Sequence, residues 1–193
     1  MKRYFVFLIL LGCSKSMLAQ SRIQQWDDAT LEYLAAHRTP AQTKGWLFMS
    51  KTNTYINVAV PVGLFTAGVI KSDPDMRQNA LYIATSTAST VIANALIKKL
   101  VKRRRPFVQN VHISAVYQPS TYSFPSGHSS SAFSTAVSLS RAYPKWYVIA
   151  PSLLWAGTVS YSRMYLGVHY PSDVATGALL GTGAAFALGF MRP

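Results

Sequence analysis

The sequence is organised around one stretch near its C-terminal end, SRMYLGVHYPSD, which occupies residues 162–173. It contains the last histidine of the chain, His169, and Asp173, the only acidic residue after Asp75. Proline suits the first turn of a helix, where its missing N–H costs no hydrogen bond, so Pro171 predicts a helix start with Asp173 in the first turn. His169 is then expected just before this helix, within reach of the carboxylate.

This pair supports two interpretations. A carboxylate that accepts a proton from one imidazole nitrogen fixes the tautomer and leaves the other nitrogen free, which would make His169 an activated nucleophile or base. Alternatively, Asp173 only caps a helix and His169 is a half-buried loop residue. The pair alone does not separate the two, so the rest of the chain has to decide.

Composition indicates one domain with an anionic partner. A chain of 193 residues is a single domain by length. Hydrophobic residues make up 50% and charged residues 13%, with a mean hydropathy of +0.16, which is rich for a soluble domain and lean for a fully lipid-embedded one. Nineteen basic against six acidic residues give a net charge of +13, so a phosphate, a membrane surface or a nucleic acid is the expected partner.

Residues 1–19 have the pattern of a secretory signal peptide, in which Lys2 and Arg3 precede an apolar run and Ala19 offers a cleavage site. Cys13 ends a segment that resembles a bacterial lipoprotein site. An uncleaved anchor is a third alternative, although polar residues interrupt the run well before the roughly 20 residues that a span needs. Because Cys13 is the sole cysteine, an intrachain disulfide and a thiolate metal site are excluded.

Residues 20–193 are expected to form the functional domain. In residues 21–54, apolar residues near helical spacing predict a short amphipathic helix that lies on the membrane or packs on the domain, with an ordinary surface helix as the alternative. Nothing catalytic is visible there. Five hydrophobic helices are expected to follow, at residues 55–70, 80–97, 130–139, 146–161 and 174–191.

The predicted fold class is all-α, because the sequence shows no β alternation. We expect a bundle of about five to six hydrophobic helices, embedded in a membrane, with an active site at one end. Several of these helices are short for a span, so a buried bundle in a soluble protein is the alternative. If the mature N-terminus is outside the cytoplasm, the loops 98–129 and 162–171 share the outer face. The basic cluster 98–105 is then an exception to the positive-inside tendency, so either this topology is wrong or the cluster binds an anion.

Two further segments carry potential chemistry. Lys98 and Arg105 are seven residues apart and would share one helix face if the helix continues to about Arg104, with Pro106 ending it. In FPSGH, residues 124–128, the residues Pro, Ser and Gly ahead of a helix start would direct free backbone N–H groups toward an anion, with His128 beside them. Each segment alone is compatible with a surface anchor or an ordinary loop.

Together the three segments resemble the signature of the type-2 phosphatidic acid phosphatase family, which includes bacterial lipid phosphatases, class A acid phosphatases and vanadium haloperoxidases. Six residues separate Lys98 from Arg105-Pro106, as in the family signature, and the Pro-Ser-Gly-His sequence is intact. Five residues separate Arg163 from His169, and three separate His169 from Asp173. The motifs cover residues 98–173.

The resemblance implies a role for each signature residue. His169 would attack phosphorus to form a phosphohistidine and Asp173 would orient it, while His128 would act as general acid and then as general base. The phosphoryl oxygens would be held by the remaining signature positions, Lys98, Arg105, Ser126, Gly127 and Arg163.

No metal and no other cofactor is expected. Because Asp173 is the only acidic residue after Asp75, the chain cannot assemble the acidic cluster of a two-metal phosphatase. His112 is interpreted as lining the substrate entrance, and His37 as a surface residue. The basic residues outside the signature are interpreted as attracting anionic headgroups; they are Lys99, Lys102, Arg103 and Arg104.

The expected function is a phosphatase that hydrolyses a lipid phosphate or pyrophosphate of the phosphatidate, phosphatidylglycerol phosphate, undecaprenyl pyrophosphate or lipid A type. The expected partners are that lipid and the membrane, without nucleic acid or an obligate protein partner. The expected location is the bacterial inner membrane with the site facing outward, or alternatively a periplasmic or lipid-anchored protein. The rival functions are a soluble secreted acid phosphatase and a non-catalytic protein that binds anionic lipid. A vanadate-dependent haloperoxidase is less favoured because the chain is compact.

Overall fold

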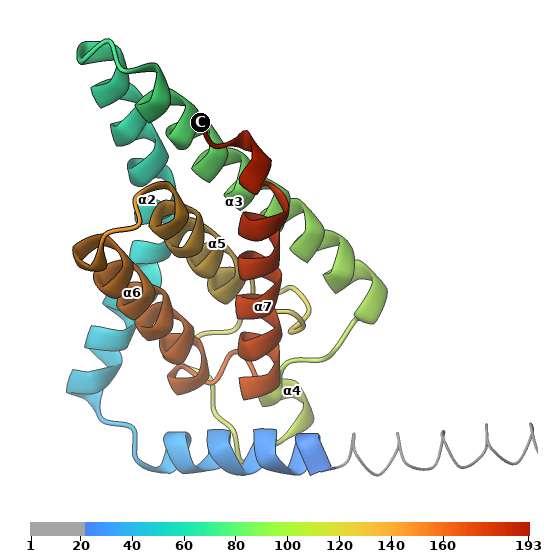
Figure 1. Cartoon of the computed structure of the whole chain (residues 1–193). Helices are drawn as coiled ribbons and strands as arrows, with labels where there is room; N and C mark the ends of the chain where they lie inside the picture. Colours follow the sequence, from blue (N-terminus) through green and yellow to red (C-terminus); the bar gives the residue numbers. More distant parts are fainter. Residues whose placement is uncertain (1–21) are drawn as a thin grey trace, which may run out of the picture.

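A computed structural model describes residues 22–193, and in this range every regular element is a helix (Figure 1). The all-α prediction is therefore confirmed. The signal peptide, its cleavage after Ala19 and the alternatives at Cys13 lie outside the described residues. The elements are a first helix at residues 22–36, followed by α2 (Pro40–Ile70), α3 (Pro74–Val101), α4 (Pro106–Gln109), α5 (Gly127–Ala142), α6 (Trp146–Tyr165), α7 (Pro171–Ala187) and the 3₁₀ turn η1 (Gly189–Met191).

The N-terminal region differs from the single short helix predicted for residues 21–54. The first helix stops before Thr39, whose hydroxyl accepts the backbone N–H of Gln42 at 3.3 Å and caps α2. Pro40 then occupies the first turn of α2, so the second half of the predicted segment is continuous with the hydrophobic helix after it. Polar residues along 40–54 concealed this continuity in the sequence.

Helices α2 and α3 form a long hairpin. Asp73 caps α3 by accepting the backbone N–H of Met76 at 2.9 Å, and Pro74 starts the helix. Within the described part of the chain, residues 40–70 and 74–109 are the two helical stretches long and apolar enough to cross a membrane. Most of their large apolar side chains are exposed, whereas Tyr82 and Ile83 of α3 are buried against the bundle.

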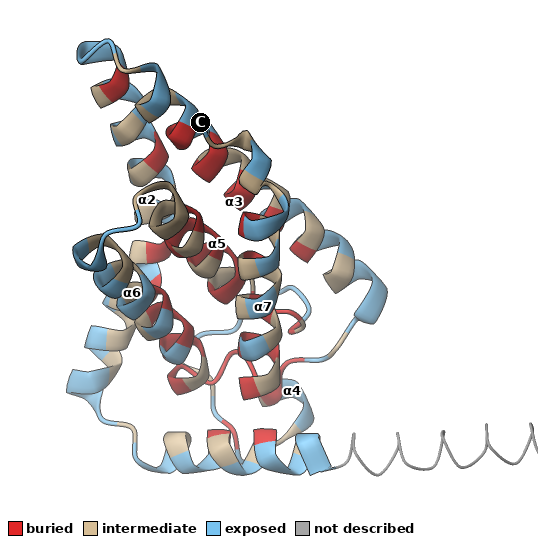
Figure 2. Cartoon of the chain, viewed as in Figure 1, coloured by how far each residue is buried: buried red, intermediate tan, exposed pale blue. Residues whose placement is uncertain are grey.

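Helix α5 lies at the centre and contacts α2, α3, α6 and α7. Its buried positions are serine, threonine and alanine, which allow neighbouring helices to approach closely. Helix α7 approaches most tightly: a Cβ on Gly177 would lie 2.6 Å from the Ser126 carbonyl oxygen, and one on Gly181 would lie 2.0 Å from the Ser130 carbonyl oxygen. Buried residues accordingly gather on α5, α6 and α7 (Figure 2).

The loops before α5 and α7 meet at one end of the bundle, as predicted, and the first helix lies across this end (Figure 1). That helix packs on the domain through Leu31, which joins Ile113 and Tyr170 in a buried cluster. It exposes Trp26 and Tyr33, residue types that favour a membrane–water interface.

Candidate active site

His169 and Asp173 adjoin at the start of α7. Pro171 and Asp173 occupy the first turn of this helix, which confirms the predicted helix start. His169 Nδ1 lies 3.6 Å from Asp173 Oδ2, longer than a hydrogen bond, and catalytic hydrogen bonds often tighten only when substrate binds. The same oxygen accepts the Tyr170 backbone N–H at 3.0 Å and the Ser123 hydroxyl. The carboxylate is therefore fixed beside the imidazole.

The His169 imidazole is held in its neutral form. Its side chain is almost fully buried, and this burial lowers the pKa of His169 to about 3. Arg163 and Arg105 also lower it, while Asp173 acts in the opposite direction. At neutral pH the imidazole therefore keeps a free lone pair, which a nucleophile needs.

Arg105 lies on the other side of the imidazole from Asp173. Its Nη1 is 3.3 Å from His169 Nε2 and donates to the Val168 carbonyl at 2.7 Å. Its Nε donates to the Thr121 carbonyl at 2.7 Å. These fixed contacts put a guanidinium group next to the nitrogen that would attack a phosphoryl group.

Lys98 and Arg105 do not share a helix face, so that prediction is wrong. Helix α3 ends at Val101 because Lys102 adopts a left-handed conformation (φ = 51°), and Arg105 caps the separate helix α4. The loop ahead of α5 brings the two cations to the same end instead. Lys98 Nζ donates to the Tyr122 carbonyl at 2.7 Å, one residue beyond the Thr121 carbonyl that holds Arg105.

Arg163 comes from the last turn of α6 and is only 2% exposed. Its Nη1 donates to the hydroxyl groups of Ser50 and Tyr117. Its buried Nε has no hydrogen-bond partner among residues 22–193. The side chain therefore keeps a donor available to a further anionic group.

The FPSGH segment forms the predicted helix start, but Ser126 has partners of its own. Ser126 is buried as the cap of α5, and its backbone N–H donates to the Asp173 carbonyl at 3.0 Å. This bond joins the second and third signature segments. In the first turn of α5, the N–H groups of Gly127 and His128 lack intrahelical acceptors, as at any helix start, and such groups can bind an anion. Phosphate binding by this segment stays a prediction.

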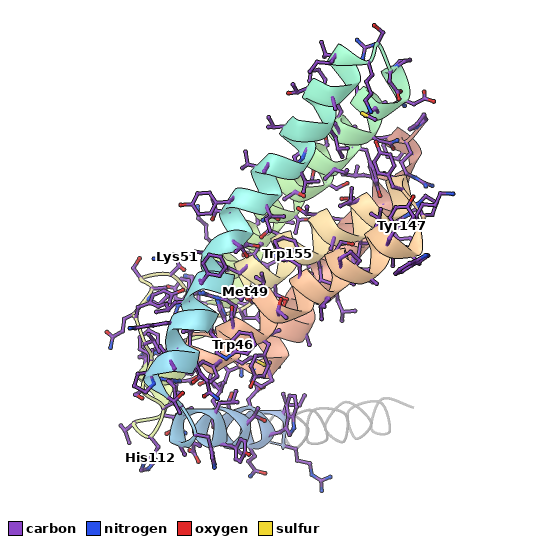
Figure 3. The ribbon with its side chains drawn as sticks, turned by 90° about the vertical axis from the view of Figure 1, so that its left-hand side faces the viewer. Trp46, Met49, Lys51, His112, Tyr147 and Trp155 are labelled. Atoms are coloured by element: carbon purple, nitrogen blue, oxygen red, sulfur yellow. The ribbon has the colours of Figure 1, made fainter. Side chains whose placement is uncertain are left out.

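His128 opens onto a cavity of about 630 Å³. Burial lowers the pKa of His128, and the nearby positive charges of Arg163, Arg105 and Lys98 lower it further. The cavity is lined by Leu47, Ser50, Lys51, Thr54, Tyr55, Val116, Tyr117 and His128. Lys51 lies on α2 beyond Trp46 and Met49 (Figure 3).

Residues outside the signature also contact this end of the bundle. Arg103, which was expected to attract anionic headgroups, forms ion pairs with Asp27 at 2.8 Å and Asp173 at 2.7 Å. Residues 21–54, where the sequence showed nothing catalytic, supply Asp27 to this contact and Ser50 to Arg163. Asn94, one helical turn before Lys98, was equally unforeseen, and its side-chain amide donates to the Pro125 carbonyl at 3.3 Å.

The other histidines lie outside this cluster. His112 is exposed beside the first helix, at the end of the molecule and away from Lys51 (Figure 3). His37 stacks on Tyr33 at a ring distance of 4.2 Å and is exposed, as predicted. Among residues 22–193, no three His, Cys, Asp or Glu side chains are grouped so that they could hold a metal ion.

Comparison with known proteins assigns the family. The family model described as the PAP2 superfamily matches residues 79–191, which is more than half of the chain. The chain belongs to the PAP2 superfamily. Among solved structures, a transmembrane PAP2 type phosphatidylglycerolphosphate phosphatase from Bacillus subtilis superposes with a TM-score of 0.74 over 96% of this chain and 92% of that one, at 24% identity. LpxE of Aquifex aeolicus superposes with a TM-score of 0.67 over 83% of this chain and 92% of that one, at 25% identity.

Sequence relatives within the PAP2 superfamily carry several phosphatase names. An undecaprenyl-diphosphatase of Sulfolobus acidocaldarius is 35% identical over 57% of this chain and 53% of that protein. A lipid A 4′-phosphatase of Bacteroides thetaiotaomicron is 34% identical over 50% of this chain and 46% of that protein. A decaprenylphosphoryl-5-phosphoribose phosphatase of Mycolicibacterium smegmatis is 37% identical over 60% and 61%. The chain thus spans about half the length of the curated relatives it matches. The chain shares its fold with a transmembrane PAP2 type phosphatase, and its residues 22–193 include two helical stretches long and apolar enough to cross a membrane.

Proposed function

We propose that this protein is a phosphatase that hydrolyses a lipid phosphate or lipid diphosphate through a phosphohistidine at His169. Membership of the PAP2 superfamily and the names of the relatives support the reaction class. The contacts of His169 with Asp173 and Arg105, and the position of His128 in the cavity wall, support the mechanism.

The observation that favours a lipid over a soluble substrate is an apolar groove that adjoins the active-site cavity. A hollow of about 690 Å³ lies between α2 and α3, and it meets the cavity at Thr54, which lines both. Val58, Val62 and Phe65 line it on the α2 side, and Leu81 and Val91 on the α3 side. A hydrocarbon chain in this groove would leave its phosphate beside His128.

Each signature residue has a place in the proposed reaction. His128 enters the reaction protonated, a form that the negative charge of the bound phosphate favours. His169 Nε2 attacks phosphorus, the bond from phosphorus to the leaving oxygen breaks, and the His128 imidazolium gives that oxygen its proton. Water then loses a proton to His128 and attacks the phosphohistidine, which releases phosphate and restores neutral His169. Lys98, Arg105 and Arg163, with the N–H groups of the α5 first turn, stabilise the negative charge that the phosphoryl oxygens carry.

We place the site on the outer side of a bacterial inner membrane. Two spans between an outside N-terminus and Lys98 return the chain to the outside, and the basic residues of the opposite end then follow the positive-inside tendency. The basic run 98–105 at the outer end is accounted for by phosphate binding at Lys98 and Arg105 and by the ion pairs of Arg103.

Phosphate release by the detergent-purified protein tests the proposal. Phosphatidate, undecaprenyl pyrophosphate and a small soluble phosphomonoester are compared with excess chelator, for the wild type and His169→Ala. We expect chelator-resistant release that prefers a lipid and falls by about 10³-fold or more without the nucleophile. Release that persists in His169→Ala would contradict the mechanism, and preference for the soluble ester would favour the secreted acid phosphatase.

A further inference from the structure

The first helix, residues 22–36, contributes one fully buried carboxylate to the catalytic end of the bundle. Asp27 is 0% exposed, although it lies on a helix that otherwise faces largely outward. Its Oδ1 accepts the backbone N–H of Ser172 at 2.9 Å, and its Oδ2 accepts the Ser172 hydroxyl. Because Ser172 directly precedes Asp173 in the first turn of α7, Asp27 holds the helix start that carries the catalytic pair.

Arg103 joins Asp27 to Asp173. Its Nη2 lies 2.8 Å from Asp27 Oδ2, and its Nη1 lies 2.7 Å from Asp173 Oδ1. Nη1 also donates to the Ser172 hydroxyl at 2.7 Å, and the guanidinium carbon stacks 4.0 Å above the Tyr170 ring. The guanidinium group is thus fixed by two carboxylates, a hydroxyl and an aromatic ring.

This arrangement affects His169 through Asp173, because Asp173 uses its other oxygen, Oδ2, to face the imidazole. If the Arg103 guanidinium group were paired with Asp173 alone, it would neutralise more of the negative charge of the Asp173 carboxylate, and less of that charge would act on His169. Since Asp27 shares the single positive charge of Arg103, Asp173 keeps more negative charge for the imidazole. The contact also fixes the carboxylate plane, on which the 3.6 Å approach to Nδ1 depends.

We propose that Asp27 and Arg103 are positioning residues for the His169–Asp173 pair, so that the first helix is part of the catalytic apparatus and not only an anchor. This inference rests on the proposed function, because it assigns the two residues a part in the same phosphoryl transfer. It extends the site beyond the three signature segments, to a residue 76 positions away from Arg103 in sequence.

The test compares Asp27→Asn with Glu32→Gln, a neutralisation on the same helix. Glu32 is exposed and contacts only the Asn110 side chain, at 2.8 Å, so it reports on helix docking without touching the catalytic pair. Outer partners of this kind typically contribute a factor of about 10–100 in activity. We expect kcat for the preferred lipid to fall by that factor in Asp27→Asn while KM stays within about threefold, and both constants to stay within about twofold in Glu32→Gln.

The pH profile separates positioning from a purely structural effect. Removing the negative charge of Asp27 disfavours protonation of the nearby imidazoles, so the acid limb of kcat/KM moves to lower pH in Asp27→Asn. A variant that is only partly folded loses amplitude without such a shift. An unchanged kcat and an unchanged acid limb would overturn the inference.

Two further measurements keep the inference testable in every case. If Asp27→Asn fails to fold because Arg103 loses a partner, the double variant Asp27→Asn/Arg103→Gln removes both charges, and it should fold with kcat lowered by about 10–100-fold. Full activity of this double variant would overturn the inference. If the wild type releases phosphate from no substrate, the proposed function fails, and binding of orthovanadate decides the inference instead. If Asp27→Asn binds orthovanadate about tenfold more weakly than Glu32→Gln does, the inference is supported. Equal orthovanadate binding by the two variants contradicts the inference.

Discussion

The α5–α7 pair and the α2–α3 pair of this PAP2 protein pack in opposite ways. At Gly177 and Gly181, α7 approaches the backbone of α5 so closely that no side chain fits. Helices α2 and α3 meet at their connecting turn, separate toward the active-site end, and leave an apolar groove between them (Figure 1). The close pair carries His128 and Asp173, whose geometry must be fixed, whereas the open pair borders the hollow where a lipid chain would lie.

Gly181→Ala should break the close pair and have the largest effect on stability. Its Cβ would lie 2.0 Å from the Ser130 carbonyl oxygen and 2.7 Å from the Ser134 backbone nitrogen, so α5 and α7 would have to separate. We expect a loss of about 1–3 kcal/mol or more, the usual cost of overpacking, together with loss of activity because His128 moves away from His169. Thermal unfolding in detergent measures the first effect and phosphate release the second.

Gly63→Ala on α2 is the matched control. No atom lies within 4 Å of the position that its Cβ would take, and alanine favours a helix over glycine by up to about 1 kcal/mol. The variant should therefore unfold at the same temperature as the wild type or a higher one. Equal destabilisation by the two substitutions would show that the two helix pairs do not differ in packing.

The close pair was also the more predictable part of the molecule. The helix start at Pro171, the position of Asp173 in its first turn and the helix start after Ser126 follow from local rules that act within a few residues. The pairing of Asp27 with Arg103 carries no such local signal, because each lies in a segment whose charge pattern fits an ordinary exposed surface. The only available hint was that an aspartate among apolar residues of an amphipathic helix needs a partner.

The contacts that residues outside the signature make with Arg163 could not be predicted from the sequence for a similar reason. Ser50 and Tyr117 bind Arg163 from a polar part of α2 and from the irregular stretch before α5, and neither belongs to a recognisable pattern. The left-handed residue Lys102 ends α3 without the glycine that usually marks such a position, so no local signal indicated that the helix stops before Arg104. Local rules predicted the helix starts at Pro171 and after Ser126, while tertiary contacts determine how the signature side chains are held.

Ala88→Phe tests the role of the open pair. Ala88 lines the groove on α3, and a phenyl ring there would occupy space needed by a hydrocarbon chain without touching the signature residues. We expect kcat/KM for the lipid substrate to fall by about tenfold and that for a small soluble phosphomonoester to stay within twofold, since loss of buried apolar contact costs a lipid chain about 1–2 kcal/mol.

Leu96→Phe on the same helix serves as the control, because Leu96 is exposed and does not line the groove. It should leave both substrates unaffected. If Ala88→Phe lowers activity on the lipid and on the soluble ester equally, the groove does not hold the substrate chain, and the contrast between the two helix pairs is one of stability alone.

Lys51→Met should have the smallest effect and sharpen the comparison where the two helix pairs meet. Lys51 lines the cavity on the α2 side together with His128, which is proposed to protonate the leaving oxygen. We therefore expect its ammonium group to lie near the leaving part of a bound substrate. In a lipid diphosphate that part carries a second phosphate, whereas in phosphatidate it is a neutral alcohol. An exposed ammonium group contributes up to about 1 kcal/mol to an ion pair, so kcat/KM for the diphosphate should fall by about fivefold and that for phosphatidate by less than twofold.

Lys44→Met, two turns earlier on α2 and outside the cavity, should affect neither substrate. Equal losses on both substrates in Lys51→Met would mean that the residue attracts anionic lipid in general, whereas a selective loss would identify a diphosphate as the substrate that this cavity fits.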